Sequence, residues 1–261
     1  MKLTFLGTSH GITEKDRFTS STLLSVGNKH YIIDAGAPIM KLLQEKDVDF
    51  ADIGGIFITH SHGDHYMGLV EFTNQIEVFA RFQGIKINIT APELFPFAEM
   101  RKFLFGDEED GGINIKKAGG SRSAEEGMSP RVTCTKYTAG KIFEDENVNI
   151  TAFKTKHFTD SHSLLIEAEG KKVLFTGDLR HDLIDFPFDA VEGGVDLVIM
   201  EAAHSLFDSE IAINTFRKIP TKRMLVNHIY TARNTPEMVG TADKAVDYPI
   251  TIVNDNDTFE I

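Results

Sequence analysis

Four residues of types that bind metal ions fall within six positions of the chain: His60, His62, Asp64 and His65. Histidine and carboxylate together suit zinc, and also manganese or iron. Two histidines two positions apart in an extended turn can bind one ion, while Asp64 and His65 can serve a second ion beside it. A polar turn with surface histidines is the alternative, but the cluster follows a predicted buried strand, which favours metal binding.

Three further residues of ligand type stand at the ends of predicted strands: His157, Asp178 and His228. A lone histidine at a strand end usually forms only hydrogen bonds. The shared position of all three indicates that they complete the metal site. His162 competes with His157, because both lie in the segment KHFTDSHSLL. We favour His157, which comes directly after the strand and leaves a short turn before the next hairpin.

The segments that must position these residues alternate between short strands and helices. Strands are predicted at 2–6, 21–26, 30–34, 56–59, 85–90, 131–138, 148–156, 163–169, 171–178, 195–200 and 223–227, with edge structure at 249–253 and 259–261. Helices are predicted from Pro38 onward and at 67–79, 92–105, 210–217 and 236–246. Two strand-rich halves that each feed helices suit a two-sheet core faced by helices.

Two segments invite more specific predictions. The helix at 92–105 is dense in phenylalanine, and we expect Phe95, Phe97, Phe103 and Phe105 to be core or pocket wall. Residues 106–130 are rich in acidic residues and glycine and break the alternation of strands and helices. They form either a plain surface loop or a lid over a site, since long loops often carry function.

Composition narrows the class of protein. The 261 residues show no break that divides them, so we expect a single domain over residues 1–261. A formal net charge of −12 disfavours a broad nucleic-acid-binding face. Cys134 is the single cysteine, which excludes an internal disulfide and a cysteine-rich zinc module. No apolar run approaches the roughly 20 residues of a membrane helix or forms a signal peptide, so we expect a cytoplasmic protein without membrane contact.

The ordered set of candidate ligands resembles the signatures of the metallo-β-lactamase superfamily, and the resemblance covers most of the chain. The counterparts are the acidic residue in Ile33-Asp34-Ala35-Gly36, the HxHxDH motif at 60–65, the lone His157, the pair Gly177-Asp178 and the late His228. The resemblance implies an αββα sandwich of two mixed sheets flanked by helices, with a two-metal centre at one edge of the sheets.

The resemblance also implies which residue would bind which ion. One ion would be bound by His60, His62 and His157, and the other by Asp64, His65 and His228, with Asp178 bridging them. The cofactors would be two divalent metal ions, zinc as the first expectation and manganese or iron as alternatives. Asp34 would orient the ligands, since ligating histidines need a partner for their other nitrogen. A simple turn-forming aspartate before Gly36 is the alternative.

Two metal ions lower the pKa of a bridging water and clamp the attacked and leaving oxygens, which is the chemistry of hydrolysis. Asp64 is a candidate catalytic residue that would accept the proton of the water. His62 stands where flavodiiron proteins carry glutamate, which argues against oxygen-reducing iron chemistry.

The substrate class rests on weaker similarities. The opening FLGTSHG, Ser20-Ser21 and the segment 200–204 look most like the branch of ribonuclease Z and small phosphodiester hydrolases. That likeness makes His204 a candidate general acid or phosphate contact, against a plain surface histidine. Arg233 is a second candidate phosphate contact, against a solvated side chain.

We therefore expect a small-molecule phosphodiester as substrate. Transfer RNA is disfavoured, because the chain lacks a long glycine-rich basic arm and is strongly acidic. The alternatives are a lactone or thioester hydrolase and, from another class, a metal-containing ligand-binding or sensor protein. A homodimer is compatible with these predictions.

Overall fold

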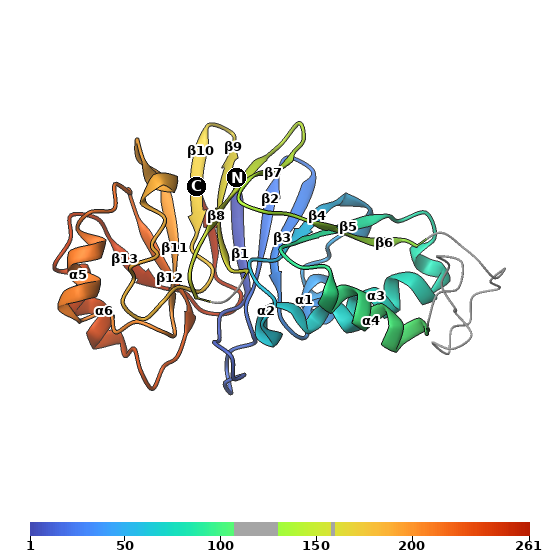
Figure 1. Cartoon of the computed structure of the whole chain (residues 1–261), viewed down its shortest axis with the longest axis horizontal. Helices are drawn as coiled ribbons and strands as arrows, with labels where there is room; N and C mark the ends of the chain where they lie inside the picture. Colours follow the sequence, from blue (N-terminus) through green and yellow to red (C-terminus); the bar gives the residue numbers. More distant parts are fainter. Residues whose placement is uncertain (107–129, 158–159) are drawn as a thin grey trace.

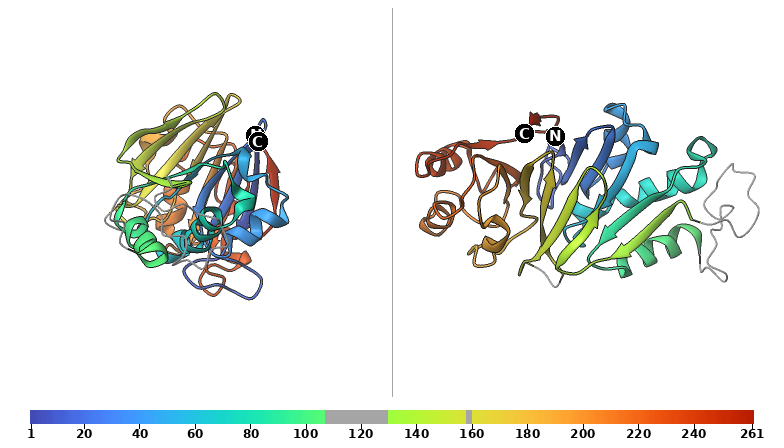
Figure 2. Two further views of the ribbon diagram at one scale, coloured as in Figure 1. Left: turned by 90° about the vertical axis from the view of Figure 1, so that its right-hand side faces the viewer. Right: turned by 90° about the horizontal axis from the view of Figure 1, so that it is seen from above.

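A computed structural model of the chain describes residues 1–106, 130–157 and 160–261 (Figure 1). Two seven-stranded sheets form its centre. Sheet A has the strand order β14-β1-β2-β3-β4-β5-β6, and sheet B has the order β13-β12-β11-β10-β9-β8-β7. The first and the last strand along the chain, β1 and β14, pair with each other, so the two chain termini lie close together (Figure 2).

The elements have the following bounds. Sheet A consists of β1 (Lys2–Gly7), β2 (Ser21–Val26), β3 (Lys29–Ala35), β4 (Ile53–Phe57), β5 (Ile87–Ala91), β6 (Val132–Lys136) and β14 (Thr258–Glu260). Sheet B consists of β7 (Gly140–Glu144), β8 (Asn149–Lys154), β9 (His162–Ala168), β10 (Lys171–Phe175), β11 (Leu197–Ala202), β12 (Met224–Ile229) and β13 (Ile250–Ile252). The helices are α1 (Ile39–Glu45), α2 (Gly63–Tyr66), α3 (Gly68–Val78), α4 (Phe95–Phe105), α5 (Glu210–Phe216) and α6 (Pro236–Asp243), with short 3₁₀ turns η1 (Phe50–Asp52), η2 (Ala80–Phe82) and η3 (Phe188–Val191).

Each sheet is antiparallel in one part and parallel in the other. In sheet A, the pairs β14–β1, β1–β2 and β2–β3 are antiparallel, while the pairs β3–β4, β4–β5 and β5–β6 are parallel. In sheet B, β7 to β10 are antiparallel and β10 to β13 are parallel. Parallel strands end at the same edge of a sheet, so the segments that follow their carboxyl ends gather there.

Three apolar cores hold the layers together. One lies between sheet A and the helices α1, α3 and α4, one lies between sheet B and the helices α5 and α6, and the third lies between the two sheets. The neighbours Ile32 and Ile33 belong to different cores because successive side chains of a strand point to opposite faces. The end-on view of Figure 2 shows the blue strands of sheet A beside the yellow-green strands of sheet B. The predicted αββα sandwich of two mixed sheets flanked by helices is therefore confirmed.

Several element predictions differ from the structure. The strand β7 was not predicted, and its mixed, partly exposed side chains lack a clear apolar alternation. The strand β4 ends at Phe57, so Thr59 lies beyond it. The phenylalanines of 92–105 were predicted to be core or pocket wall, and the prediction of a core position is wrong for Phe95 and Phe103, which are 69% and 76% exposed. Only one face of α4 packs on the core, and these two side chains occupy the opposite face.

Other predictions stay as they were. The segment predicted as a loop or lid at 106–130 lies outside the described residues except for its two end residues. The single domain, the cytoplasmic location and the homodimer stay predictions. None of the helices in the described part of the chain has the length and apolar content that crossing a membrane requires.

Candidate metal centre

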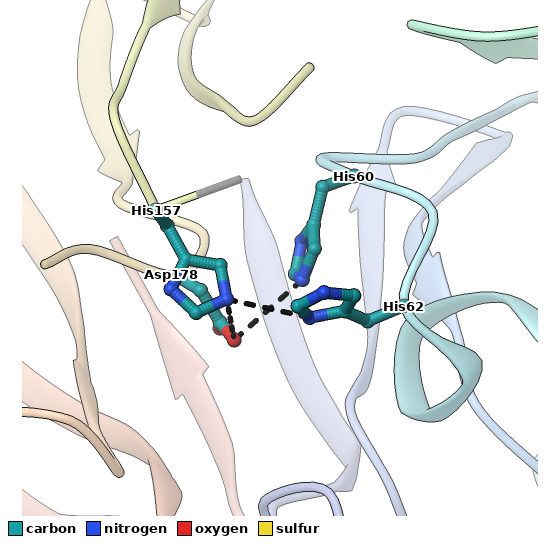
Figure 3. Close-up of side chains that lie close together, drawn as sticks. All are labelled: His60, His62, His157 and Asp178. Carbon is teal, nitrogen blue, oxygen red and sulfur yellow. Dashed lines mark hydrogen bonds and ion pairs between the residues drawn. The ribbon is translucent and has the colours of Figure 1, made fainter. Parts of the chain in front are cut away.

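His60, His62, His157 and Asp178 point toward one another at the edge where the two sheets meet (Figure 3). His60 and His62, the first two histidines of the HxHxDH motif, follow β4. His157 follows β8 and Asp178 follows β10, both in the opposite sheet. The Nε2 atoms of His60 and His157 each lie 3.6 Å from Oδ2 of Asp178. Nε2 of His157 is 3.3 Å from Nδ1 of His62. Four donor atoms from four separate side chains therefore surround one point.

A second group lies beside the first and consists of Asp64, His65 and His228. Oδ2 of Asp64 is 3.3 Å from Nε2 of His65 and 3.6 Å from Nε2 of His228. The other oxygen of Asp178, Oδ1, lies 3.4 Å from Nε2 of His65 and 3.3 Å from Nε2 of His228. Asp178 thus turns one carboxylate oxygen toward each group, which is the geometry of a bridging ligand.

Two local features place Asp178 and His228. Gly177 has a φ of +55°, and a Cβ there would lie 2.8 Å from the carbonyl oxygen of His162, so only glycine suits this close turn before Asp178. In β12, Asn227 pairs with Glu201 while Ile229 pairs with Ala202, which leaves His228 as an extra residue with a φ of 50°. Such a bulge redirects a side chain and is common beside functional sites.

The donor set fits metal ions. His60 Nε2, His65 Nε2 and Asp178 Oδ1 are buried and have no hydrogen-bond partner among the described residues. A buried polar atom without a partner is costly, by about 1–3 kcal/mol for a neutral group and more for a charged one. Divalent ions at the two groups would satisfy these atoms, and histidine with carboxylate is a donor set typical of zinc.

Two residues of the first group, Asp178 and His60, favour the protonation states that metal binding requires. Burial disfavours the charged form of Asp178, but the neighbouring His228, His65 and His60 outweigh this effect and hold the pKa of the carboxyl group well below its usual range. Burial, followed by the charge of His65, lowers the pKa of His60 well below the usual value. A deprotonated carboxylate and a neutral imidazole are the forms that coordinate metals.

Asp34 positions one of the histidines. His65 donates from Nδ1 to Oδ2 of Asp34 at 2.8 Å, which leaves Nε2 free to face the second group. The same carboxylate accepts hydrogen bonds from the backbone N–H of Thr59 at 2.8 Å and from its hydroxyl. Asp34 therefore connects the end of β3 with Thr59, directly before the HxHxDH motif, and with His65 at its end, as expected for a residue that orients ligands.

Asp185 has a comparable role that the sequence did not reveal. Its carboxylate accepts a hydrogen bond from the backbone N–H of Lys156 at 2.7 Å and another from the backbone N–H of Arg180 at 3.0 Å. Lys156 directly precedes His157 and Arg180 lies two positions after Asp178, so one buried carboxylate connects the two loops that carry these candidate ligands. The segment around Asp185 carries no motif, and no sequence signal could have singled it out.

His204 lies at the rim of the first group. Its ring centroid is 4.4 Å from that of His157, and its Nδ1 is 3.3 Å from Oε1 of the buried Glu201. Burial lowers the pKa of His204, but the interactions with Glu201 and the charge of Asp178 outweigh burial and raise the pKa to about 8. The neighbouring carboxylates thus favour the protonated form of this imidazole.

The two remaining candidates, His162 and Arg233, belong to neither group of candidate ligands. His162 lies outside both ligand groups: its Nδ1 is 3.1 Å from the carbonyl oxygen of Asp160, and its ring packs against Tyr137. Of the two histidines, His157 is the one that lies in the first group. Arg233 is exposed but close enough for its charge to oppose the protonation of His204.

The fold and the site define a metallo-β-lactamase-fold protein with two adjoining groups of candidate ligands. The profile of the family described as Anti-Pycsar protein Apyc1 matches residues 1–208, and the chain belongs to this family. The metallo-β-lactamase fold protein YhfI from Bacillus subtilis superposes with a TM-score of 0.74 over 100% of this chain and 99% of its own, at 17% identity.

Curated relatives include ribonucleases and Anti-Pycsar proteins. The chain is 29% identical over 195 residues to an Anti-Pycsar protein Apyc1 of Bacillus phage vB_BsuM-Goe3, which covers 71% of each chain. It is 28% identical over 182 residues to ribonuclease Z of Mycobacterium bovis (strain BCG / Pasteur 1173P2), which covers 68% of this chain and 62% of the relative. The matched region thus spans less than two thirds of that relative's length. These similarities confirm the superfamily and the branch predicted from the sequence.

Proposed function

We propose that this chain is a metal-dependent phosphodiesterase that hydrolyses a small phosphodiester, with a cyclic nucleotide as the first substrate to test. The observation that carries the proposal is the position of Asp178, whose two oxygens face the two adjoining groups of candidate ligands. We assign His60, His62 and His157 to one ion, Asp64, His65 and His228 to the other, and Asp178 to both.

When bound, two divalent ions of this kind lower the pKa of water and stabilise the charge that develops on a phosphoryl group. The side chains around them supply the proton transfers. Asp64, a member of the second group, would accept the proton of the attacking water. His204, whose Nδ1 lies 3.3 Å from Glu201, would donate a proton to the leaving oxygen as the P–O bond breaks.

The relatives' names support the choice of bond. A ribonuclease cleaves phosphodiester bonds of RNA, and the Anti-Pycsar protein Apyc1 gives its name to the family of this chain. The rim of the site also offers positive charge to a phosphate, from His204 and from Arg233 nearby. The net charge of −12 disfavours a large polyanion such as transfer RNA as substrate. Proteins gain most of their non-specific affinity for nucleic acids through a broad basic surface.

A substrate panel tests the proposal. Protein reconstituted with zinc, manganese or iron is assayed on cyclic nucleotides, bis-p-nitrophenyl phosphate, precursor transfer RNA, lactones and thioesters. We expect hydrolysis of the small phosphodiesters and none of the carbonyl substrates. The opposite pattern would replace the proposal with a lactone or thioester hydrolase, and tight metal binding without turnover of any substrate would leave a sensor or binding protein.

A further inference from the structure

A pair of aromatic rings stands next to the second group of candidate ligands. The ring centroids of His10 and Tyr230 lie 4.2 Å apart, with an angle of 36° between the ring planes. Tyr230 follows His228 by two positions, and a Cβ at Gly11 would lie 3.9 Å from Oδ2 of Asp64. The two rings therefore belong to the loops that border Asp64 and His228.

The fold holds this ring pair in a fixed position. Ile229 donates its backbone N–H to the carbonyl oxygen of Thr8 at 2.9 Å, which joins the end of β12 to the segment after β1. Glu14 accepts hydrogen bonds from the hydroxyl of Thr231 at 2.9 and 3.0 Å, and its carboxylate is 3.6 Å from Nε2 of His10. One carboxylate thus connects the loops that carry the two rings.

Tyr230 differs from the other tyrosines of the chain. The hydroxyls of Tyr31, Tyr137 and Tyr248 each form a hydrogen bond with another residue, and Tyr66 is buried. Tyr230 is 38% exposed, and its hydroxyl forms no hydrogen bond to any described residue. Its ring is supported by His10 yet is not enclosed by the described part of the chain.

We propose that Tyr230, supported by His10, binds the nucleobase of the substrate by stacking and thereby determines specificity for nucleotide phosphodiesters. This inference rests on the proposed function and deepens it. A supported, partly exposed aromatic ring offers a flat apolar surface at low entropic cost, and stacking tolerates every base because each base has a π-face. The base would then lie beside the phosphodiester that the metal ions hold.

Binding is tested without turnover by a tryptophan probe. The chain contains no tryptophan, so Tyr230→Trp introduces a single reporter. We expect adenosine 5′-monophosphate to quench its fluorescence and ribose 5-phosphate, which lacks the base, to leave it unchanged. Tyr248→Trp is the matched control, because Tyr248 precedes β13 at its amino end, whereas the candidate ligands lie at or beyond the carboxyl ends of their strands. Equal quenching of the two variants, or none of Tyr230→Trp, would overturn the proposal.

Kinetics give the second measurement. Tyr230→Ala should raise KM for a cyclic nucleotide roughly 5- to 150-fold, because a lost base–aromatic stack costs about 1–3 kcal/mol. KM for ribose 3′,5′-cyclic phosphate, which has no base, should stay unchanged. Tyr230→Phe should retain wild-type KM, and the metal content of all variants should be equal. Equal losses on both substrates would contradict a role in base binding. Absence of phosphodiester hydrolysis by the wild-type protein would instead refute the proposed function, which the fluorescence measurement does not require.

Discussion

Oδ2 of Asp34 lies 2.8 Å from Nδ1 of His65, and this contact fixes which nitrogen of His65 faces the second group of candidate ligands. Asp34→Asn would present an amide that can donate where the histidine N–H also donates. We expect the variant to bind metal about 10- to 100-fold more weakly, as is typical for the loss of such a partner. Zinc titration with a competing chelator measures the change, and Asp189→Asn, an exposed site, is the control. Unchanged zinc affinity would show that Asp34 only shapes the turn.

The pair of histidines in the segment 157–162 gives a discriminating test. His157→Ala should remove a ligand of the first group and reduce the metal content and the activity by at least about 100-fold, beyond the loss seen for orienting partners. His162→Ala should retain both metal ions, because His162 contacts Tyr137 and Asp160 instead. Elemental analysis of the two purified variants checks this, and the reverse result would reassign the ligand.

Asp185 should matter for metal binding although it is not a candidate ligand. Asp185→Ala leaves the backbone N–H groups of Lys156 and Arg180 without their acceptor, at a cost of about 1–3 kcal/mol for each group that stays buried. We expect lower unfolding free energy and faster hydrogen exchange in the loops of His157 and Asp178, together with weaker metal binding. Asp182→Ala in the same loop, where the carboxylate pairs with the exposed Arg180 side chain, should leave metal affinity intact.

Removal of metal should destabilise the whole protein. Asp178 and the histidines around it have several buried N and O atoms that lack a hydrogen-bond partner among the described residues. Bound ions would satisfy these atoms. At a metal concentration of about 100 times Kd, one bound ion adds about 2.7 kcal/mol to the unfolding free energy. Thermal unfolding with and without a chelator measures the effect, and added zinc should restore the melting temperature. A melting temperature insensitive to chelator would argue against a metal centre at this position.

His204 should act on the leaving group. His204→Ala is expected to lower kcat about 10²- to 10⁴-fold for substrates with an alkoxide leaving group, the range for a lost general acid. The loss should be much smaller for bis-p-nitrophenyl phosphate, since p-nitrophenolate leaves without protonation. Glu201→Gln, which removes the charge that pairs with His204, should show the same trend more weakly. An equal loss on both substrates would assign His204 to phosphate binding.

The sequence alone was sufficient for the fold class and for the set of candidate ligands. Residues such as His60, Asp178 and His228 could be found because each follows an apolar strand of recognisable pattern, and parallel strands bring their carboxyl ends to one edge. The order of the motifs along the chain then indicated the superfamily. That these residues coordinate metal stays a proposal, although the structure brings all seven of them into two adjoining groups.

Only the tertiary structure decided which of these residues contact one another and which other residues hold them in place. The sequence favoured His157 over His162 by its place directly after a strand, and the fold shows that the ring of His157 lies in the first group while His162 faces Asp160 and Tyr137. The ties made by Asp185 and the stack of His10 on Tyr230 join segments far apart in the chain, so their existence depends on strand register and loop path. The periodicity of a sequence shows which side of an element is apolar. It does not show which distant side chains that element contacts, and the candidate site consists of such contacts.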